Sequence, residues 1–407
     1  MIKHFLIFLF LACYQTGNAQ NIKTIQLRPK HNTNQFSAIV RLGDVLKLSF
    51  DDLDGDNKEY QYKIEHMTHD WKPSSLTSNQ YINGFNENEI INSSNSFNTL
   101  QLYTHYSVEI PNKNTIITKS GNYLLSVLDD DYEVVFSRRC VFYEDITTVG
   151  VAVFRSRDAQ SNQKKQTVQF TVNHQNLVIN NPSQEINTVL FQNHNWKTVI
   201  NNIQPQFIKP QQLVYNHTFK TNFWGGNEFL NFDSKHLRNT SLNIAKTERK
   251  ELYHSYLYTD EQRINKIYTY NPDINGQFVV RTLEANDPNT EADYSIVHFS
   301  LDAYEPYDNK EVFVYGAFNN YQLSDENKLK YNAIDEIYEG SIKFKQGFYN
   351  YNYATLNKNN SLVDLNEIDG SFYQTENKYT VVVYYKPFGG TYDRVIGVGN
   401  GYFNQNR

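Results

Sequence analysis

Alternation of apolar and polar residues recurs along the chain and constrains its fold more than any other feature. Leu46, Leu48 and Phe50 alternate with Lys47 and Ser49. The same period of two recurs over residues 60–65, 168–172 and 349–353. Because successive side chains of a strand point to opposite faces, this pattern indicates half-buried antiparallel strands.

Short turn clusters separate these segments, as expected of β-sandwiches or barrels. They are Asp54-Gly55, Asn112-Lys113-Asn114, Ser120-Gly121-Asn122 and Asn275-Gly276. Residues 233–253 could be read as an amphipathic helix, but Asn239-Thr240-Ser241 in their middle disfavours one. We therefore predict an all-β chain.

Two polar segments, near residues 144–150 and 286–289, divide the 407 residues. They predict three tandem β-sandwich domains of ordinary size, at 20–147, 148–288 and 289–407. The linking segments are short and not rich in Gly or Ser, which favours a semi-rigid rod.

Composition narrows the class of protein. Aromatic residues make up 15% of the chain, enough to build cores and to argue against disorder. A net charge of -6 argues against nucleic-acid binding, because no basic field is available to neutralise phosphates. Two cysteines cannot form a disulfide scaffold or a Cys-based metal site.

The first residues have the features of an export signal. The apolar run Phe5 to Ala12 is too short to span a bilayer, and Gly17-Asn18-Ala19 is a small-x-small cleavage site. We predict a cleaved signal peptide at 1–19. Leu11-Ala12-Cys13 leaves open a lipoprotein anchored through Cys13.

Two clusters could be considered as metal sites. Asp52, Asp54 and Asp56 alternate as in a calcium loop, but the Gly and Glu that such a loop requires are missing, which favours a solvated hairpin turn. His66 and His69 would point to opposite faces of a strand, which disfavours a site with Asp70. We predict no metal and no cofactor.

No catalytic motif is present: the sequence has no H-E-x-x-H, G-x-S-x-G, P-loop or Cys-x-x-Cys pattern. Cys140 is interpreted as a packed residue, not as a nucleophile. We predict that the protein is not an enzyme.

The last domain contains a possible sugar-binding motif. Residues 312–321 resemble the V-x-G-x-F-N-x-W opening of early-set immunoglobulin-like modules of glycogen-active enzymes, and residues 347–351 resemble their G-x-Y-x-Y strand. Tyr321 stands at the first Trp position and no second Trp follows, which favours a non-binding descendant of that fold.

A set of short runs in a fixed order can be compared with known families. In the first domain they are residues 48–53, 60–66, Asp70-Trp71, Ser74, Leu76, Tyr81, Gly84-Phe85, 103–106, Ile110-Pro111, 120–123 and Arg138-Arg139. In the rest of the chain they are Asn227-Glu228-Phe229, Phe232-Asp233, Asp260, Arg263, 273–278, 370–372, 375–377, Tyr379, 383–385 and Tyr392-Asp393. Through these runs the sequence resembles, over nearly its whole length, the type IX secretion system plug family of Bacteroidetes-type bacteria. The sequence departs from the family pattern at Leu230, where Arg is expected, and at Cys140, where an aromatic is expected.

The resemblance implies an immunoglobulin-like first domain, a central β-sandwich and an early-set-like C-terminal domain. It also implies a periplasmic protein at the inner face of the outer membrane, monomeric when free, without small-molecule substrate. Its partner would be the giant outer-membrane β-barrel translocon, which the plug closes when no cargo passes. A periplasmic carbohydrate-binding protein and a cell-surface adhesin are the competing interpretations.

Three aromatic residues carry predictions about their surroundings: two as a contact with the partner and one as a core residue. Phe223 and Trp224, before Gly225-Gly226, are the predicted contact with the barrel, because both are costly to expose unless a partner covers them. A loop folded onto its own sandwich is the alternative. Trp71 is expected in the core of the first domain.

Overall fold

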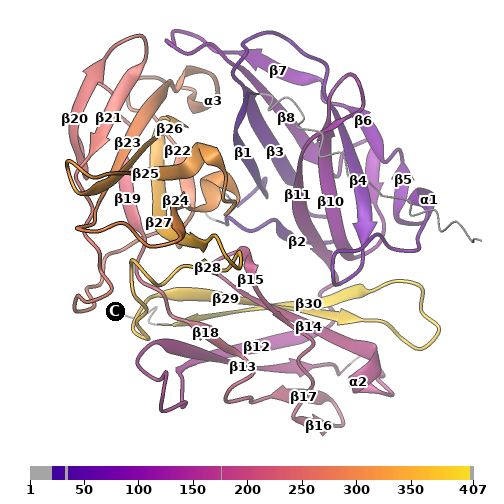
Figure 1. Ribbon diagram of the computed structural model, residues 1–407. Helices are drawn as coiled ribbons and strands as arrows, with labels where there is room; N and C mark the ends of the chain where they lie inside the picture. Colours follow the sequence, from indigo (N-terminus) through magenta and orange to yellow (C-terminus); the bar gives the residue numbers. More distant parts are fainter. Residues whose placement is uncertain (1–20, 33–34, 176, 404–407) are drawn as a thin grey trace, which may run out of the picture.

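The computed structural model describes residues 21–403 except 33, 34 and 176, so the predicted signal peptide and Cys13 lie outside the described residues. The described chain is almost entirely β-structure, which confirms the prediction of an all-β protein of β-sandwiches. Figure 1 shows three bodies that meet at one junction. No helix in the described part of the chain is long and apolar enough to cross a membrane.

The first body, here the N-terminal sandwich, packs two sheets face to face. One has the order β1 (Ile22–Pro29), β3 (Leu46–Asp52), β8 (Thr104–Ile110), β7 (Asn92–Asn95). The other has the order β2 (Ile39–Arg41), β11 (Val134–Tyr143), β10 (Gly121–Leu128), β4 (Gln61–Met67), β6 (Glu87–Glu89). A small ribbon of β5 (Ile82–Gly84) and β9 (Thr115–Ile117) follows α1 (Ser78–Tyr81).

The alternating residues of this body form its core, as the period of two requires. Leu46, Leu48 and Phe50 of β3 face Tyr62 and Ile64 of β4 in one buried cluster. The intervening Lys47 and Ser49 are more exposed.

The second body, here the central sandwich, is also built from two sheets. One contains β12 (Thr148–Arg155), β13 (Lys165–Asn173), β17 (Gln212–Tyr215) and β16 (Phe207–Lys209), with β18 (Asn222–Trp224) also paired to β13. The other contains β15 (Asn195–Asn201), β14 (Ile186–Gln192), β29 (Asn377–Tyr385) and β30 (Arg394–Phe403). The helix α2 (Pro182–Glu185) precedes β14.

The third body, here the inserted domain, is one continuous sheet folded around a single core. Its main path is β19 (Leu230–Asp233), β27 (Gly347–Asn357), β24 (Lys310–Tyr315), β25 (Lys328–Asn332), β26 (Ile337–Lys345), β23 (Tyr294–Asp302), β21 (Tyr253–Leu257), β20 (Ile244–Arg249). Also present are β22 (Phe278–Val280), β28 (Val363–Asp364), α3 (Pro288–Glu291) and the 3-10 turns η1 (Ala317–Asn319) and η2 (Asp325–Asn327).

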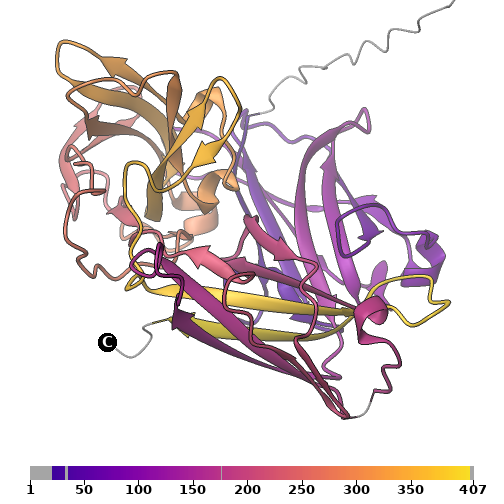
Figure 2. The same cartoon turned by 60° about the horizontal axis from the view of Figure 1, so that its bottom comes forward.

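The strand pairing does not follow the predicted ranges 148–288 and 289–407. Strands β29 and β30 return to the central sandwich, where β29 pairs with β14 from Ile186↔Tyr385 to Gln192↔Tyr379. The inserted domain therefore lies within the central sandwich and does not follow it in tandem; the yellow β29 and β30 lie among the magenta strands in Figures 1 and 2. Local pattern could not reveal this, because a buried strand carries no mark of which distant strand it pairs with.

Strand β29 is buried on both faces, and its two faces serve different cores. Tyr379, Val381 and Val383 lie in the core of the central sandwich. Val382 and Tyr384 point the other way, into an apolar cluster with Ile39 and Val141 of the N-terminal sandwich. The two sandwiches therefore share an interface with an apolar centre.

Trp71 lies at this interface and not, as expected, in the core of the N-terminal sandwich. Its ring packs edge-to-face on Trp196 of β15 with centroids 5.0 Å apart, and the Arg139 guanidinium lies 4.6 Å from its ring centroid. Nearby, the backbone amide and Nδ1 of His69 bond to Asp393 Oδ2 at 2.8 and 3.0 Å.

We expect Trp71→Ala to lower the free energy of unfolding by about 3 kcal/mol, the low end for deleting a buried Trp, because the ring is partly exposed. Urea denaturation of Trp71→Ala, Trp196→Ala and the double variant would check this. The double variant should lose less unfolding free energy than the two single variants lose together, since the two rings contact each other. Strict additivity would contradict the shared interface.

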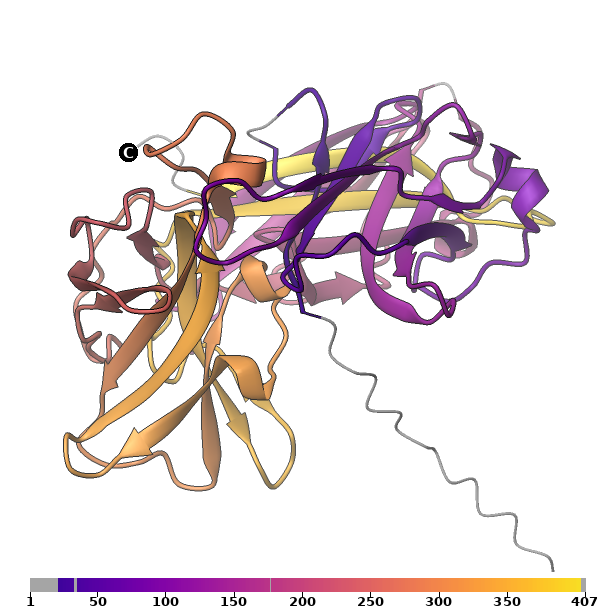
Figure 3. The same cartoon turned by 90° about the horizontal axis from the view of Figure 1, so that it is seen from above.

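The inserted domain contacts the N-terminal sandwich through a buried polar cluster around Asp51 of β3. Lys345 Nζ lies 2.7 Å from Asp51 Oδ2, Tyr294 donates to the same oxygen at 2.6 Å, and His105 Nδ1 lies 2.6 Å from Oδ1. Asp51 is fully buried and Lys345 is 1% exposed. Figure 3 shows the two bodies side by side.

Candidate partner-binding groove

A groove of about 840 Å³ runs between the central sandwich and the inserted domain. On the central side its walls are β15 and β18, and on the inserted side they are β28 and the segment 364–372. Tyr315 and Tyr321 form part of its lining and are themselves buried.

The predicted contact pair divides between the core and this groove. Phe223 is 5% exposed, packs on Tyr379 with ring centroids 5.1 Å apart, and belongs to the core of the central sandwich. Trp224 is 47% exposed on the groove wall, with Lys165 Nζ 4.4 Å from its ring centroid. The opposite orientations follow from the strand conformation of β18.

Gly225 and Gly226 pack tightly against the segment around Phe372. A Cβ on Gly225 would meet Phe372 O at 2.0 Å, and Gly226 adopts a left-handed φ of +65°. Phe372 N donates to Gly226 O at 2.8 Å, and Gly225 N donates to Lys164 O at 2.8 Å. Residues 225 and 226 are thus bonded to two other segments of the chain, which fixes the backbone next to Trp224.

Three further apolar side chains in the groove wall are exposed, and the sequence analysis did not identify them. Ile264 is 42%, Leu362 66% and Val363 48% exposed. The sequence does contain a signal for two of them. Leu362 and Val363 form an apolar pair between Asn360-Ser361 and Asp364, and apolar residues in a polar loop are costly to expose unless a partner covers them. Together with Trp224 they make an apolar surface on which a partner could pack.

A group of carboxylates near the groove connects segments of the inserted domain that are far apart in the sequence. Arg263 bonds to Asp369 through Nε and Nη2 at 2.8 and 2.7 Å, and donates to Glu228 O at 2.8 Å. Burial raises the pKa of Asp260 to about 6 and that of Asp273 to about 7. These acids are held by Tyr351, Tyr353 and backbone amides, so their role is to connect structural segments.

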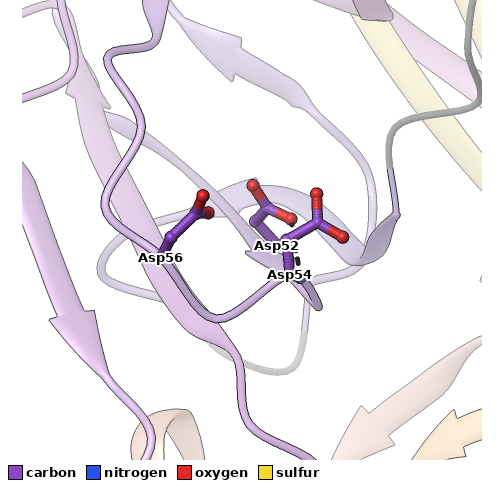
Figure 4. Close-up of side chains that lie close together, drawn as sticks. All are labelled: Asp52, Asp54 and Asp56. Atoms are coloured by element: carbon purple, nitrogen blue, oxygen red, sulfur yellow. Dashed lines mark hydrogen bonds between the residues drawn. The ribbon is translucent and has the colours of Figure 1, made fainter.

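The other predicted clusters are placed apart from the groove. The carboxylates of Asp52, Asp54 and Asp56 lie within 4.8 Å of one another at one turn (Figure 4). Lys58 Nζ lies 3.0 Å from Asp52 and 3.7 Å from Asp56, and also contacts Asp54. The Lys58 ammonium therefore offsets part of the repulsion among the three carboxylates.

The two histidines are not brought together. His66 is 3% exposed and packs on Tyr123, and burial lowers its pKa to about 4, whereas His69 bonds to Asp393 across the interface. Burial also raises the pKa of the Cys140 thiol well above its ordinary value, which makes it a poor nucleophile.

Tyr321 is not placed to stack on a sugar. It is 7% exposed, and its hydroxyl contacts Gln277 Nε2 at 3.2 Å and Asn193 O at 3.4 Å. A carbohydrate platform needs exposed aromatic faces, and the ring packs on Tyr315 inside the fold.

Comparison with known proteins agrees with this architecture. Residues 22–144 match the profile of a family described as type 9 secretion system plug protein 1st domain. A crystal structure of a hypothetical protein from Parabacteroides merdae is 31% identical, with a TM-score of 0.89, covering 94% of this chain and 97% of that one. No curated protein matches the chain.

Proposed function

Because the chain belongs to the type IX secretion system plug protein family, we propose that it binds the periplasmic opening of the outer-membrane translocon barrel and seals it between transport events. Family membership connects the chain to type IX secretion and to a periplasmic location. The family is in general not enzymatic, and the proposed activity is binding alone, with no cofactor.

The observation that carries the proposal is the joining of the two sandwiches and the inserted domain into one body. A plug must be wider than the opening that it closes and must not flex under load. The central sandwich contains the inserted domain within its own sequence, so two covalent connections join these bodies. The N-terminal sandwich contacts both, through the Asp51 cluster and the apolar face of β29. Buried interfaces of this kind oppose relative domain motion.

The groove supplies the proposed contact surface. Trp224, Ile264, Leu362 and Val363 offer apolar contact area next to polar Asn and Gln side chains. A reversible seal requires a mixed surface, with a few aromatic anchors and a polar rim, because an extensive apolar face would give a permanent complex.

Deleting the gene should make cells permeable to bulky antibiotics that the outer membrane normally excludes, because the barrel would remain open. Secretion itself need not stop. The measurement is the minimal inhibitory concentration of such an antibiotic in wild-type, deletion and complemented cells.

The decisive control is a strain that lacks both the protein and the translocon barrel. Permeability should return to the wild-type value there, because nothing remains to be sealed. Leakage that persists without the barrel would contradict the proposal. Affinity capture of the tagged protein from detergent-solubilised outer membrane should also recover the barrel.

A further inference from the structure

A second cavity, of about 300 Å³, lies where the three bodies meet. We call it the arginine cavity, because Arg28, Arg138 and Arg139 of the N-terminal sandwich line it together with Lys197 of the central sandwich. The inserted domain contributes Phe278 and its neighbours. None of the described residues that line it is acidic, although the whole chain has a net charge of -6.

The three guanidiniums have no carboxylate partner among the described residues. Arg28 Nη2 donates to the carbonyl oxygen of Phe278 at 2.5 Å, and Arg138 Nη1 donates to that of Ser137 at 2.9 Å. Arg139 rests on the Trp71 ring. Other arginines of the chain do form ion pairs, as Arg263 does with Asp369 and Arg394 with Glu144.

Burying an unpaired cation is unfavourable, because the charged group loses its hydration. Burial lowers the pKa of Arg28 and that of Arg138 to about 10, because the charged form is poorly solvated there. A buried charge is tolerated when it is paired, and an uncompensated one strongly opposes folding. Arg28 and Arg138 are partly buried and Arg139 is exposed, so an anion in the cavity would compensate the first two charges and could also be reached by the third.

We propose that the arginine cavity binds a small anion that carries a phosphate or carboxylate group. Guanidinium groups match the oxygens of both anions through pairs of parallel hydrogen bonds. The size fits, because small-molecule sites occupy roughly 300–1,000 Å³. The rings of Phe36, Trp196 and Phe278 in its wall would contact the apolar part of the ligand.

A neighbouring cavity, of about 330 Å³, differs from the arginine cavity in the partners of its charged residues. It shares Arg138 and also contains three lysines: Lys23 and Lys345 are paired with Glu326 and Asp51, and Lys343 donates a hydrogen bond to Gln101 Oε1 at 2.8 Å. The neighbouring cavity therefore contains an acidic group of its own, Glu326, whereas the arginine cavity has three guanidiniums and no carboxylate among its described lining residues. An anion bound there would contact residues of all three bodies and stabilise their assembled state.

The test is calorimetric titration of the full mature chain with inorganic phosphate and, separately, with succinate, at constant ionic strength set by sodium chloride. We expect saturable binding of at least one anion, and a melting temperature that rises with its concentration. The two titrations distinguish a phosphate-bearing ligand from a carboxylate-bearing one. If neither anion raises the melting temperature more than chloride does, the proposal is wrong.

Arg138→Gln should weaken binding by about tenfold or more, the usual effect of losing a hydrogen bond to a charged group. Arg138→Lys should give an intermediate affinity, because lysine keeps the positive charge but cannot form the two parallel hydrogen bonds of a guanidinium group. Arg249→Gln is the matched control, since Arg249 is exposed on β20 and forms no ion pair with any described residue.

Should Arg138→Gln fail to fold, Arg139→Gln tests the same cavity from a more exposed position. Binding that stays at the wild-type affinity in every folded cavity variant would overturn the assignment. These measurements involve no barrel, so their failure would leave the proposed sealing function unaffected.

Discussion

Replacing Lys345 by Met should lower the free energy of unfolding by about 3–5 kcal/mol, because Asp51 would remain buried without its cation. The loss should be larger than for any exposed lysine. Guanidinium-induced unfolding of the purified chain would measure it. Lys330→Met is the matched control, since Lys330 is exposed on β25 and should change stability by no more than about 0.5 kcal/mol.

The double variant Asp51→Asn/Lys345→Met should be more stable than the sum of the single losses predicts, because each single change leaves the partner uncompensated. Additive losses would contradict the direct ion pair. A second check is pH. Burial alone would raise the pKa of Asp51, but Lys345 and His105 outweigh it and hold that pKa below its ordinary value.

A carboxyl group with a lowered pKa stabilises the fold above its unfolded pKa, and this contribution is lost as the pH falls through the folded pKa. The difference between wild type and Lys345→Met should therefore be complete at pH 7. It should shrink below about pH 4, where the unfolded chain also protonates. A difference that grows on acidification would show that Asp51 is not the charged partner.

Phe223→Ala should also cost about 3–5 kcal/mol, the usual range for deleting a buried Phe from a core. Trp224→Ala, the neighbouring change on β18, should cost about 1 kcal/mol or less, because half of that ring is already in water. Urea denaturation of the two variants would compare them directly.

Trp224→Ala, which should change stability little, should have the clear effect on capture of the barrel. Trp224→Ala should reduce recovery of the barrel from solubilised membrane while its melting curve stays like that of the wild type. If Trp224→Ala captures the barrel normally, the groove is not the contact surface. A collapsed melting curve for Trp224→Ala would instead assign the ring to the core.

Local sequence pattern predicted the strands well, because the period of two is a property of each strand alone. Tyr349, Tyr351 and Tyr353 all point into the core of the inserted domain, as their spacing requires. The outward Asn352 is only partly buried. The resemblance to the plug family was likewise visible in short ordered runs, and the match over residues 22–144 confirms it.

Features that depend on distant pairing could not be predicted in this way. The six apolar or aromatic residues of β29 suit any buried strand, and they do not indicate that β14 is the partner strand. Trp71 was expected in the core of the first domain because it follows the predicted strand with Tyr60, Tyr62 and Ile64, but the cluster that it joins includes residues of the central sandwich. The arginine cavity combines residues from three separate parts of the chain, so no motif identifies it.

The place of the inserted domain also determines when the protein can fold during synthesis and export. Strands β12 to β18 leave the ribosome early, yet one of their two sheets is incomplete until β29 and β30 follow the whole inserted domain. During that interval β14 exposes the edge that later pairs with β29, which is a hazard for aggregation. The inserted domain can fold in the meantime, since its strands are contiguous in sequence. Chains that stop before residue 377 should therefore keep a folded inserted domain and lose the central sandwich, because they lack β29, an interior strand of one of its two sheets.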